Sequence, residues 1–118
     1  MKDYSQKLAK LNAYIWDQAE LKFHETKSAA AIVNLLKEEG FEVETGVADM
    51  ETAFIGRAGS GKPVIGFLAE FDALSGLSQE AGVMEPKAVS GCESGHGCGH
   101  SLLGTAAVEA ALLLRDRL

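Results

Sequence analysis

The sequence predicts an α/β domain in which helices are layered around a central sheet, in the order α-α-β-β-β-loop-α. Three patterns predict this class: apolar residues recur at helical spacing near both ends of the chain, a strictly alternating segment lies between them, and a continuously apolar segment follows. The chain has 118 residues, 47% of them hydrophobic, which is enough for one domain with a core. The sequence contains neither an internal repeat nor a linker.

Two amphipathic helices are expected in the first third of the chain. Residues 3–21 repeat apolar side chains at helical spacing, at Tyr4, Leu8, Leu11 and Ile15. Residues 27–39 place a second set on one face, namely Ala29, Ile32, Val33 and Leu36. Gly40 follows as the C-terminal stop of the second helix.

Three strands are expected in the middle of the chain. Residues 41–45 alternate apolar and polar side chains, as a half-exposed strand does, and residues 52–57 form a second short strand. Residues 59–63 predict a turn, and the apolar segment 64–69 predicts a strand covered on both faces. Residues 73–97 are expected to be mostly loop.

The last expected helix covers residues 101–118. Its apolar side chains follow helical spacing at Leu102, Leu103, Ala106, Ala107, Ala110, Leu113 and Leu114. Neither a glycine cap nor a trailing loop follows it, and little chain remains to cover its two sides. We therefore expect a fold that is cut short, with this leucine face and the strand 64–69 exposed and prone to association.

One glycine motif is interpreted as a turn. Gly56-x-x-x-x-Gly61-Lys62 resembles a phosphate-binding P-loop. Pro63 stands where that motif needs a hydroxyl side chain, and the motif precedes a strand instead of opening a helix. A hairpin turn is the better interpretation.

Charge and composition narrow the function classes. A formal net charge of −6 and a pI near 5.0, without a Lys/Arg cluster, argue against a nucleic-acid partner. The N-terminus has no apolar signal core, and the longest apolar runs are too short to span a membrane. A cytoplasmic enzyme or binding protein is therefore expected. Cys92 and Cys98 are expected as reduced thiols, with a disulfide as the alternative in a secreted protein.

The segment Gly95-His96-Gly97-Cys98-Gly99-His100 indicates a metal site. Imidazole and thiolate are ligands that zinc and similar metals prefer. The alternating glycines disfavour a helix, so Cys98 and His100 are expected to converge on one ion from an extended turn. A flexible glycine loop is the alternative. A structural site that also uses Cys92 and His96 is a weaker one, because the spacing matches no common zinc finger.

Two carboxylates follow the predicted buried strand. Glu70 and Asp72 lie at its carboxyl end, where open α/β sheets bind their ligands. They are expected to bind a metal, to orient a ligating histidine, or both. A solvated strand end is the alternative.

Several of these motifs together resemble the M20 metallopeptidases, and within them the amidohydrolase branch that includes hippurate hydrolase and the aminobenzoyl-glutamate hydrolases. The resemblance is carried by four segments in the family's order: Glu20-Leu21-x-Phe23-x-Glu25, the alternating strand after Gly40, Ala69-Glu70-Phe71-Asp72-Ala73-Leu74, and His96-Gly97-Cys98-Gly99-His100. Gly76-Leu77-Ser78-Gln79 and the extension of the last segment to Thr105 are similar to the aminobenzoyl-glutamate hydrolase subgroup.

This resemblance implies a zinc-peptidase α/β/α sandwich with two metal ions, of which residues 1–118 would be the N-terminal part of the catalytic domain. Cys98 and His100 match two metal ligands, and Asp72 matches the acidic catalytic-site residue that orients them. His96 matches a position that the family does not generally use as a ligand. Glu70 replaces a common aspartate, and Ser101 stands where much of the branch has aspartate.

The resemblance also implies an activity, and it identifies residues of the family that this sequence lacks. The activity would be metal-dependent hydrolysis of an amide bond in N-acyl amino acids or aminobenzoyl-glutamate, with zinc as the divalent metal and manganese or cobalt as alternatives. The family's Glu-Glu pair with its general base, a further histidine ligand and a distal histidine are not in this sequence. Expected partners are a small-molecule amide, the missing C-terminal part or a second copy. The alternative is an inactive fragment or a subunit that binds only a metal or a partner chain.

Overall fold

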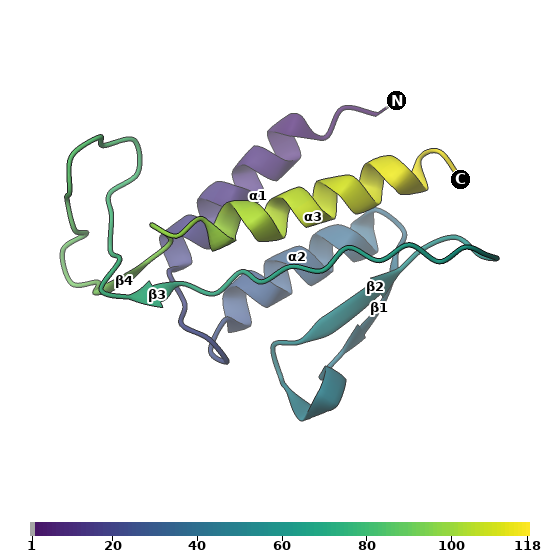
Figure 1. Ribbon diagram of the computed structural model, residues 1–118, viewed down its shortest axis with the longest axis horizontal. Helices are drawn as coiled ribbons and strands as arrows, with labels where there is room; N and C mark the ends of the chain where they lie inside the picture. Colours follow the sequence, from purple (N-terminus) through teal and green to yellow (C-terminus); the bar gives the residue numbers. More distant parts are fainter. Residues whose placement is uncertain (1) are drawn as a thin grey trace.

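Three helices form the body of the protein in a computed structural model that describes residues 2–118 (Figure 1). They are α1 (Ser5–Gln18), α2 (Thr26–Glu38) and α3 (His100–Arg115). The first two confirm the expected helices to within three residues at each end. Helix α1 packs against both α2 and α3, so the apolar faces of all three meet.

The core is the shared apolar face of these helices. All the side chains expected on the inner faces of the first two helices are buried. The cluster between the helices consists of Tyr4, Leu8, Leu11, Ile15, Ile32, Leu35, Leu36, Phe41, Val108 and Leu112. Ile15 and Leu112 are fully buried, and burial of such side chains contributes about 1.5–3 kcal/mol each.

Glu20 caps the N-terminus of α2 from outside the helix. Its carboxylate accepts hydrogen bonds from the backbone N–H groups of Lys27 and Ser28, at 2.9 and 2.8 Å. The residue in the cap position, Glu25, makes no such bond and instead accepts one from the Thr52 hydroxyl. The chain from the end of α1 is thus tied to the start of α2.

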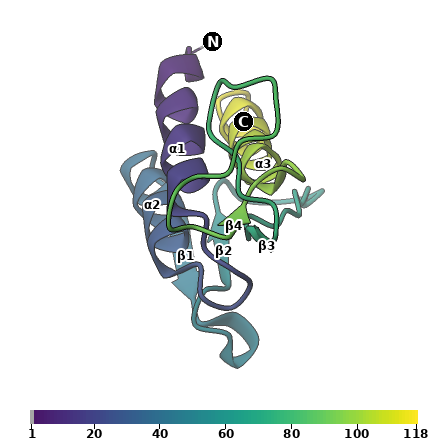
Figure 2. The ribbon, with the colours of Figure 1, turned by 90° about the vertical axis from the view of Figure 1, so that its left-hand side faces the viewer.

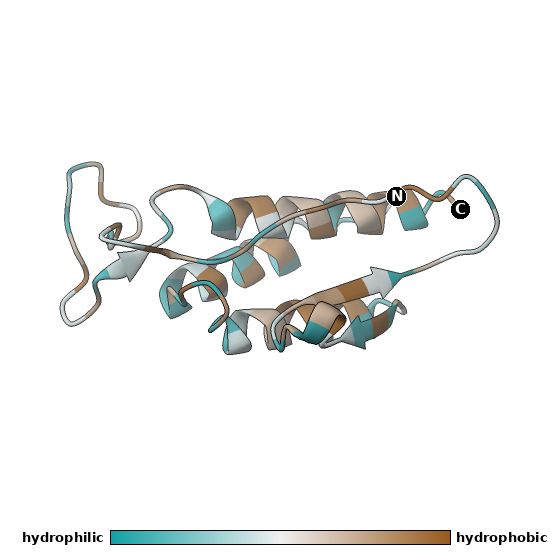
Figure 3. Cartoon of the chain, turned by 60° about the horizontal axis from the view of Figure 1, so that its bottom comes forward, coloured by the Kyte–Doolittle hydropathy of each residue, from teal (hydrophilic) through white to brown (hydrophobic). Residues whose placement is uncertain are grey.

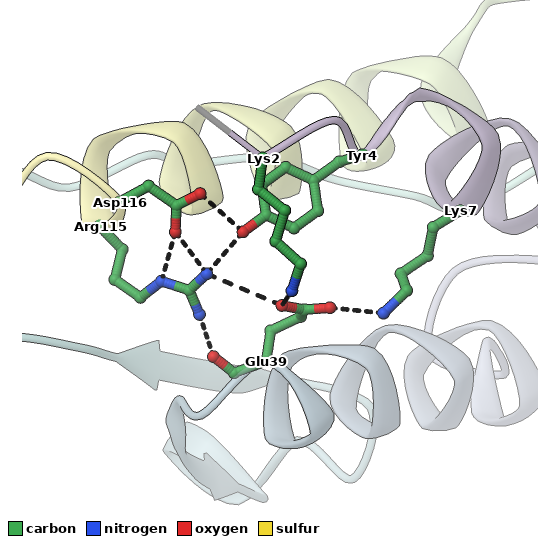
Figure 4. Close-up of polar contacts among 6 residues, drawn as sticks. All are labelled: Lys2, Tyr4, Lys7, Glu39, Arg115 and Asp116. Atoms are coloured by element: carbon green, nitrogen blue, oxygen red, sulfur yellow. Dashed lines mark hydrogen bonds and ion pairs between the residues drawn. The ribbon is translucent and has the colours of Figure 1, made fainter.

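A polar network ties the opposite ends of the helices together. Its six residues are labelled in Figure 4: Lys2, Tyr4, Lys7, Glu39, Arg115 and Asp116. The buried Glu39 carboxylate accepts hydrogen bonds from Lys2, at 2.8 Å, and from Lys7. Arg115 donates to the Glu39 carbonyl and, at 2.6 Å, to the Tyr4 hydroxyl. The start of α1, the end of α2 and the end of α3 are therefore joined around one carboxylate.

The strands form two small antiparallel sheets, and the central sheet expected from the sequence is not formed among the described residues. Strand β1 (Glu42–Thr45) pairs with β2 (Phe54–Arg57), and the short helix η1 (Val47–Asp49) lies in their connection. Strand β3 (Leu74–Ser75) pairs with β4 (Ser94–Gly95) at the base of a long loop. This loop extends beyond the ends of α1 and α3 (Figures 1 and 2).

The segment 64–69 corrects one prediction. It follows a bend at residues 61–63 and runs as an extended coil between β2 and β3, but it is neither paired as a strand nor covered on both faces (Figure 1). Val64 and Leu68 are 85% and 96% exposed. A continuous apolar run becomes a buried strand only beside other strands, and none of the described strands lies along it.

Helix α3 exposes the first leucines of its apolar pattern, as expected, and buries another face. The most buried side chains are Ser101, Thr105, Val108 and Leu112, together with Gly104. Leu102 and Leu103, which belong to the leucine face that was expected to be exposed, are exposed. The helix is apolar nearly all round, so its hydrophobic pattern alone could not select the face that meets α1.

The molecule is extended for its length. Its radius of gyration is 15.0 Å, against about 13.5 Å for a typical compact domain of 118 residues. Its accessible surface is 7774 Å², against about 6,200 Å² for a folded monomer of this mass. Figure 3 shows hydrophobic colouring on part of the extended segment between β2 and β3, which crosses the helices in this view. Within the described part of the chain, every helix falls short of the length and hydrophobicity that crossing a bilayer requires.

Candidate functional site

The candidate site lies where the turn at residues 96–99 leads into α3. The Gly99 N–H donates a hydrogen bond to the His96 carbonyl at 2.8 Å, which closes this turn. Gly99 has a φ of 96°, a conformation that favours glycine, and its carbonyl accepts hydrogen bonds from the N–H groups of Leu102 and Leu103. His100 is therefore the first residue of α3, and Cys98 lies in the turn just before it.

Asp72 holds the His100 ring by two oxygens. His100 Nδ1 lies 3.0 Å from Asp72 Oδ1 and 3.1 Å from the Asp72 carbonyl oxygen. Because both neighbours are acceptors, we assign the proton to Nδ1, which leaves Nε2 with a free lone pair. Backbone pairing positions Asp72, since the next residue, Ala73, donates its N–H to the Glu20 carbonyl at 2.7 Å.

Glu70 approaches the other side of the same ring. Its Oε1 lies 3.5 Å from His100 Nε2, and the side chain is 57% exposed, compared with 16% for Asp72. The two carboxylates thus differ in their surroundings. Asp72 is mostly buried and contacts His100 Nδ1, whereas Glu70 is exposed to solvent beside His100 Nε2. An imidazole nitrogen next to a carboxylate oxygen is a pair of donors that suits a divalent metal.

The two thiols have different surroundings, and both are free. Cys98 is exposed. Cys92 is partly buried, and its Sγ lies 3.2 Å from the Ser94 carbonyl oxygen, to which it donates. Within residues 2–118, no three His, Cys, Asp or Glu side chains converge closely enough to hold a metal ion. The alternative site that adds Cys92 and His96 to Cys98 and His100 is therefore not assembled here.

The residues present fit part of a metal site. His100 offers an Nε2 lone pair on a ring that Asp72 orients, and Cys98 offers an exposed free thiol two residues earlier. These are donors that zinc prefers, and an acidic partner on the far nitrogen is the usual arrangement around a ligating histidine. The structure brings together Asp72, His100 and Glu70, and it leaves Cys98 exposed at the surface, two residues before His100 in the sequence.

His96 belongs to the same motif but has a structural setting. Its ring is 1% exposed and lies 6.4 Å from the Trp16 ring, centroid to centroid. Among residues 2–118, neither ring nitrogen finds a hydrogen-bond partner, although the Ile15 carbonyl is nearby. Burial lowers the pKa of His96, so its ring is held neutral. The sequence offers no signal for the Trp16 contact, because α1 and the motif are far apart along the chain.

Sequence reasoning also missed how the loop between β3 and β4 is held. The Gln79 side chain donates to three loop carbonyls, those of Glu80, Val83 and Glu85, and accepts from the Lys87 N–H. A pocket of about 260 Å³ separates this loop from the end of α1, and Trp16 and Cys92 are among its lining residues. At the loop base, a Cβ on Gly95 would lie 2.1 Å from the Leu77 carbonyl oxygen.

Comparison with known proteins gives one informative relationship. No family model matches the chain. The chain is 50% identical over 101 residues to a subunit of the p-aminobenzoyl-glutamate hydrolase of Escherichia coli (strain K12). The match covers 86% of this chain and 21% of the relative, so the chain spans about a fifth of the length of the curated protein it matches.

Proposed function

We propose that this chain supplies part of the active site of a metal-dependent amidohydrolase. In this proposal Cys98 and His100 are metal ligands, and Asp72 orients His100. The observation that carries the proposal is the Asp72–His100 contact of 3.0 Å, which fixes the histidine tautomer with Nε2 free. The 50% identity to a hydrolase subunit supports the same reaction class.

The substrate class follows from the relative and from the sequence resemblance. We propose an amide of the p-aminobenzoyl-glutamate type, or another N-acyl amino acid, as substrate. From the same resemblance we propose an α/β/α sandwich of the M20 type as the complete fold. The partner would then be the rest of the hydrolase polypeptide, supplied in the same chain or by another one. We place the protein in the cytoplasm, where free thiols such as those of Cys92 and Cys98 persist.

The chain's own residues have separate roles in this proposal. A bound zinc ion, or manganese or cobalt in its place, supplies Lewis acidity that polarises the amide carbonyl and acidifies water. Asp72 keeps the His100 proton on Nδ1 and holds the ring orientation. Cys98 offers a thiolate donor from the turn before α3, and Glu70 adds negative charge beside His100 Nε2. The general base is not assigned to any residue of this chain.

Cobalt binding tests the ligand assignment. Cobalt(II) added to the purified chain should give a thiolate-to-metal absorption band, because Cys98 is exposed and free. Cys98→Ala should abolish the band and His100→Ala should weaken it, whereas Cys92→Ala serves as the matched control and should retain it. Circular dichroism checks that the helices persist. A wild-type chain without the band, or an equal band in Cys98→Ala, would overturn the assignment.

A further inference from the structure

Two consecutive carbonyl groups just after α1 hold the two strands that border the candidate site (Figures 1 and 2). The Ala19 carbonyl accepts a hydrogen bond from the Ser94 hydroxyl in β4, at 2.6 Å. The Glu20 carbonyl accepts one from the N–H of Ala73, the residue before β3, at 2.7 Å. Both strands are therefore anchored to the same short segment of the chain.

The Ser94 hydroxyl satisfies a carbonyl that the end of α1 leaves without a helical partner. Ala19 caps the helix in a left-handed conformation, with a φ of 46° and a ψ of 42°, so the helical hydrogen-bond pattern stops there. Ala19 is buried, and a buried carbonyl without a partner destabilises a fold. A left-handed alanine persists only where surrounding contacts hold it, and the Ser94 bond is one of these contacts.

The sheet formed by β3 and β4 is too short to fix the site by itself. The strands pair over two residues each, and so short a two-stranded pair is marginal without further contacts. Asp72 lies two residues before β3, and His96 directly follows β4. How closely Asp72 approaches His100 therefore depends on what holds each strand in place.

We propose that Ser94 is a positioning residue for the candidate metal site. Its hydroxyl fixes β4 against the end of α1, as the Ala73 N–H fixes β3. The two anchors together bring His100 Nδ1 to 3.0 Å from Asp72 Oδ1. The inference rests on the proposed function, in which His100 binds the metal and Asp72 orients it. Ser94 acts through the chain that joins it to His100.

The tautomer of His100 in the metal-free chain tests the proposal. Nitrogen-15 shifts distinguish a ring protonated at Nδ1 from one protonated at Nε2, and they are recorded at about pH 9, where histidine side chains are uncharged. The wild type should be mainly the Nδ1–H form, because Asp72 offers two acceptors to that nitrogen. Ser94→Ala should raise the ratio of Nε2–H to Nδ1–H roughly three- to tenfold, the range for one lost hydrogen bond. Ser94→Thr keeps the hydroxyl and should match the wild type.

Tyr4→Phe is the matched control, because it removes a hydroxyl hydrogen bond at the opposite end of α1. The Tyr4 hydroxyl donates to Asp116 at 2.8 Å. Its loss should lower stability, as Ser94→Ala does, without changing the His100 ratio. Circular dichroism should show intact helices in both variants, since Ser94 lies outside the core cluster and phenylalanine keeps the ring of Tyr4.

Several results would overturn the role of Ser94. These are a wild type that is mainly the Nε2–H form, an unchanged ratio in Ser94→Ala, or an equal change in Tyr4→Phe. A Ser94→Thr variant that behaves like Ser94→Ala would exclude the hydroxyl as the cause. Loss of the helices in Ser94→Ala would also overturn the proposal, because the bond would then hold the fold instead of the site.

Cobalt titration separates this proposal from the proposed function. Cobalt(II) should bind Ser94→Ala roughly three- to tenfold more weakly than the wild type. An unchanged cobalt affinity would overturn the role of Ser94 and leave the ligand assignment intact. A wild-type chain without the cobalt band would overturn the ligand assignment, and the metal-free ratio would still decide whether Ser94 positions His100.

Discussion

Asp72 contacts His100 through a side-chain and a main-chain oxygen, and the two contributions can be separated. Asp72→Asn keeps the carbonyl and the side-chain shape but removes the negative charge beside the ring. Loss of such an acidic partner weakens metal binding by roughly 10- to 100-fold. We expect this loss in a zinc titration by calorimetry, with no change in the urea midpoint.

The control for this substitution is Asp17→Asn, an exposed aspartate on α1 outside the proposed donor set. It should leave zinc affinity unchanged. If Asp72→Asn titrates like the wild type, Asp72 is only a polar side chain at the end of the extended segment.

At this scale the sequence predicted one contact of the candidate site but not the surroundings of His96. The position of Asp72 just after the predicted strand led to the expectation that it orients a histidine, and its contact with His100 is present. The same motif gave no indication that His96 would be buried against Trp16. Such a contact depends on how α1 packs, which no local pattern reports.

Among the elements, α2 depends on a cap that lies outside it. Burial opposes ionisation of Glu20, but the N–H groups of Lys27 and Ser28 outweigh it and leave the Glu20 pKa below its ordinary value. Glu20→Ala removes both acceptors and should cost about 1–2 kcal/mol of the free energy of unfolding. Chemical denaturation at pH 7 measures this loss.

Glu42→Ala provides the comparison, since Glu42 is an exposed glutamate on β1 and does not cap the N-terminus of a helix. It should change stability by less than about 0.5 kcal/mol. Equal effects of the two substitutions would show that the Glu20 cap contributes nothing specific.

The accuracy of the sequence prediction varies between elements for a physical reason. Helices α1 and α2 each have one apolar stripe bordered by polar residues, so Ile15 and Ile32 could be assigned to the core from spacing alone. Helix α3 is apolar on several sides, so spacing did not identify Val108 as a core residue, although Leu102 is exposed as expected. Segment 64–69 has the composition of a buried strand, but its conformation depends on neighbours that its own sequence does not specify.

For the molecule as a whole, Glu39 makes stability depend on pH. Hydrogen bonds from Lys2 and then Lys7 lower the Glu39 pKa from 4.5 to about 2. Because the folded pKa is depressed, the contribution is complete above about pH 4.5 and is lost as the pH falls towards 2. Glu39→Gln should cost about 1–2 kcal/mol at pH 7, a modest value because both lysines are largely solvated.

The measurement is the difference in unfolding free energy between the wild type and Glu39→Gln at several pH values. This difference should shrink between pH 4.5 and pH 2. Glu44→Gln, which removes an exposed ion pair with Arg57, should give a small difference at every pH. A Glu39→Gln difference that is constant with pH would contradict the role of the carboxylate charge.

The assembly of the proposed site predicts the behaviour of the isolated chain. In the proposed function this chain supplies two metal ligands and no general base, so we expect the purified chain not to hydrolyse p-aminobenzoyl-glutamate or hippurate. Activity should appear when the rest of the hydrolase polypeptide is supplied in cis or in trans, as measured by release of the free amino acid. Zinc-dependent hydrolysis by the chain alone, abolished by Cys98→Ala, would show that this expectation is wrong.

The close approach of Gly95 to Leu77 has a consequence for how such a protein diversifies. Any side chain at position 95 would collide with the main chain opposite, so the two ends of the loop between β3 and β4 are fixed relative to each other. The tip around Met84 is free of this constraint. Exchanges of the Met84 side chain can therefore accumulate while the hydrogen bonds from Gln79 to the carbonyls on either side of it are kept, and the turn that carries Cys98 and His100 keeps its place.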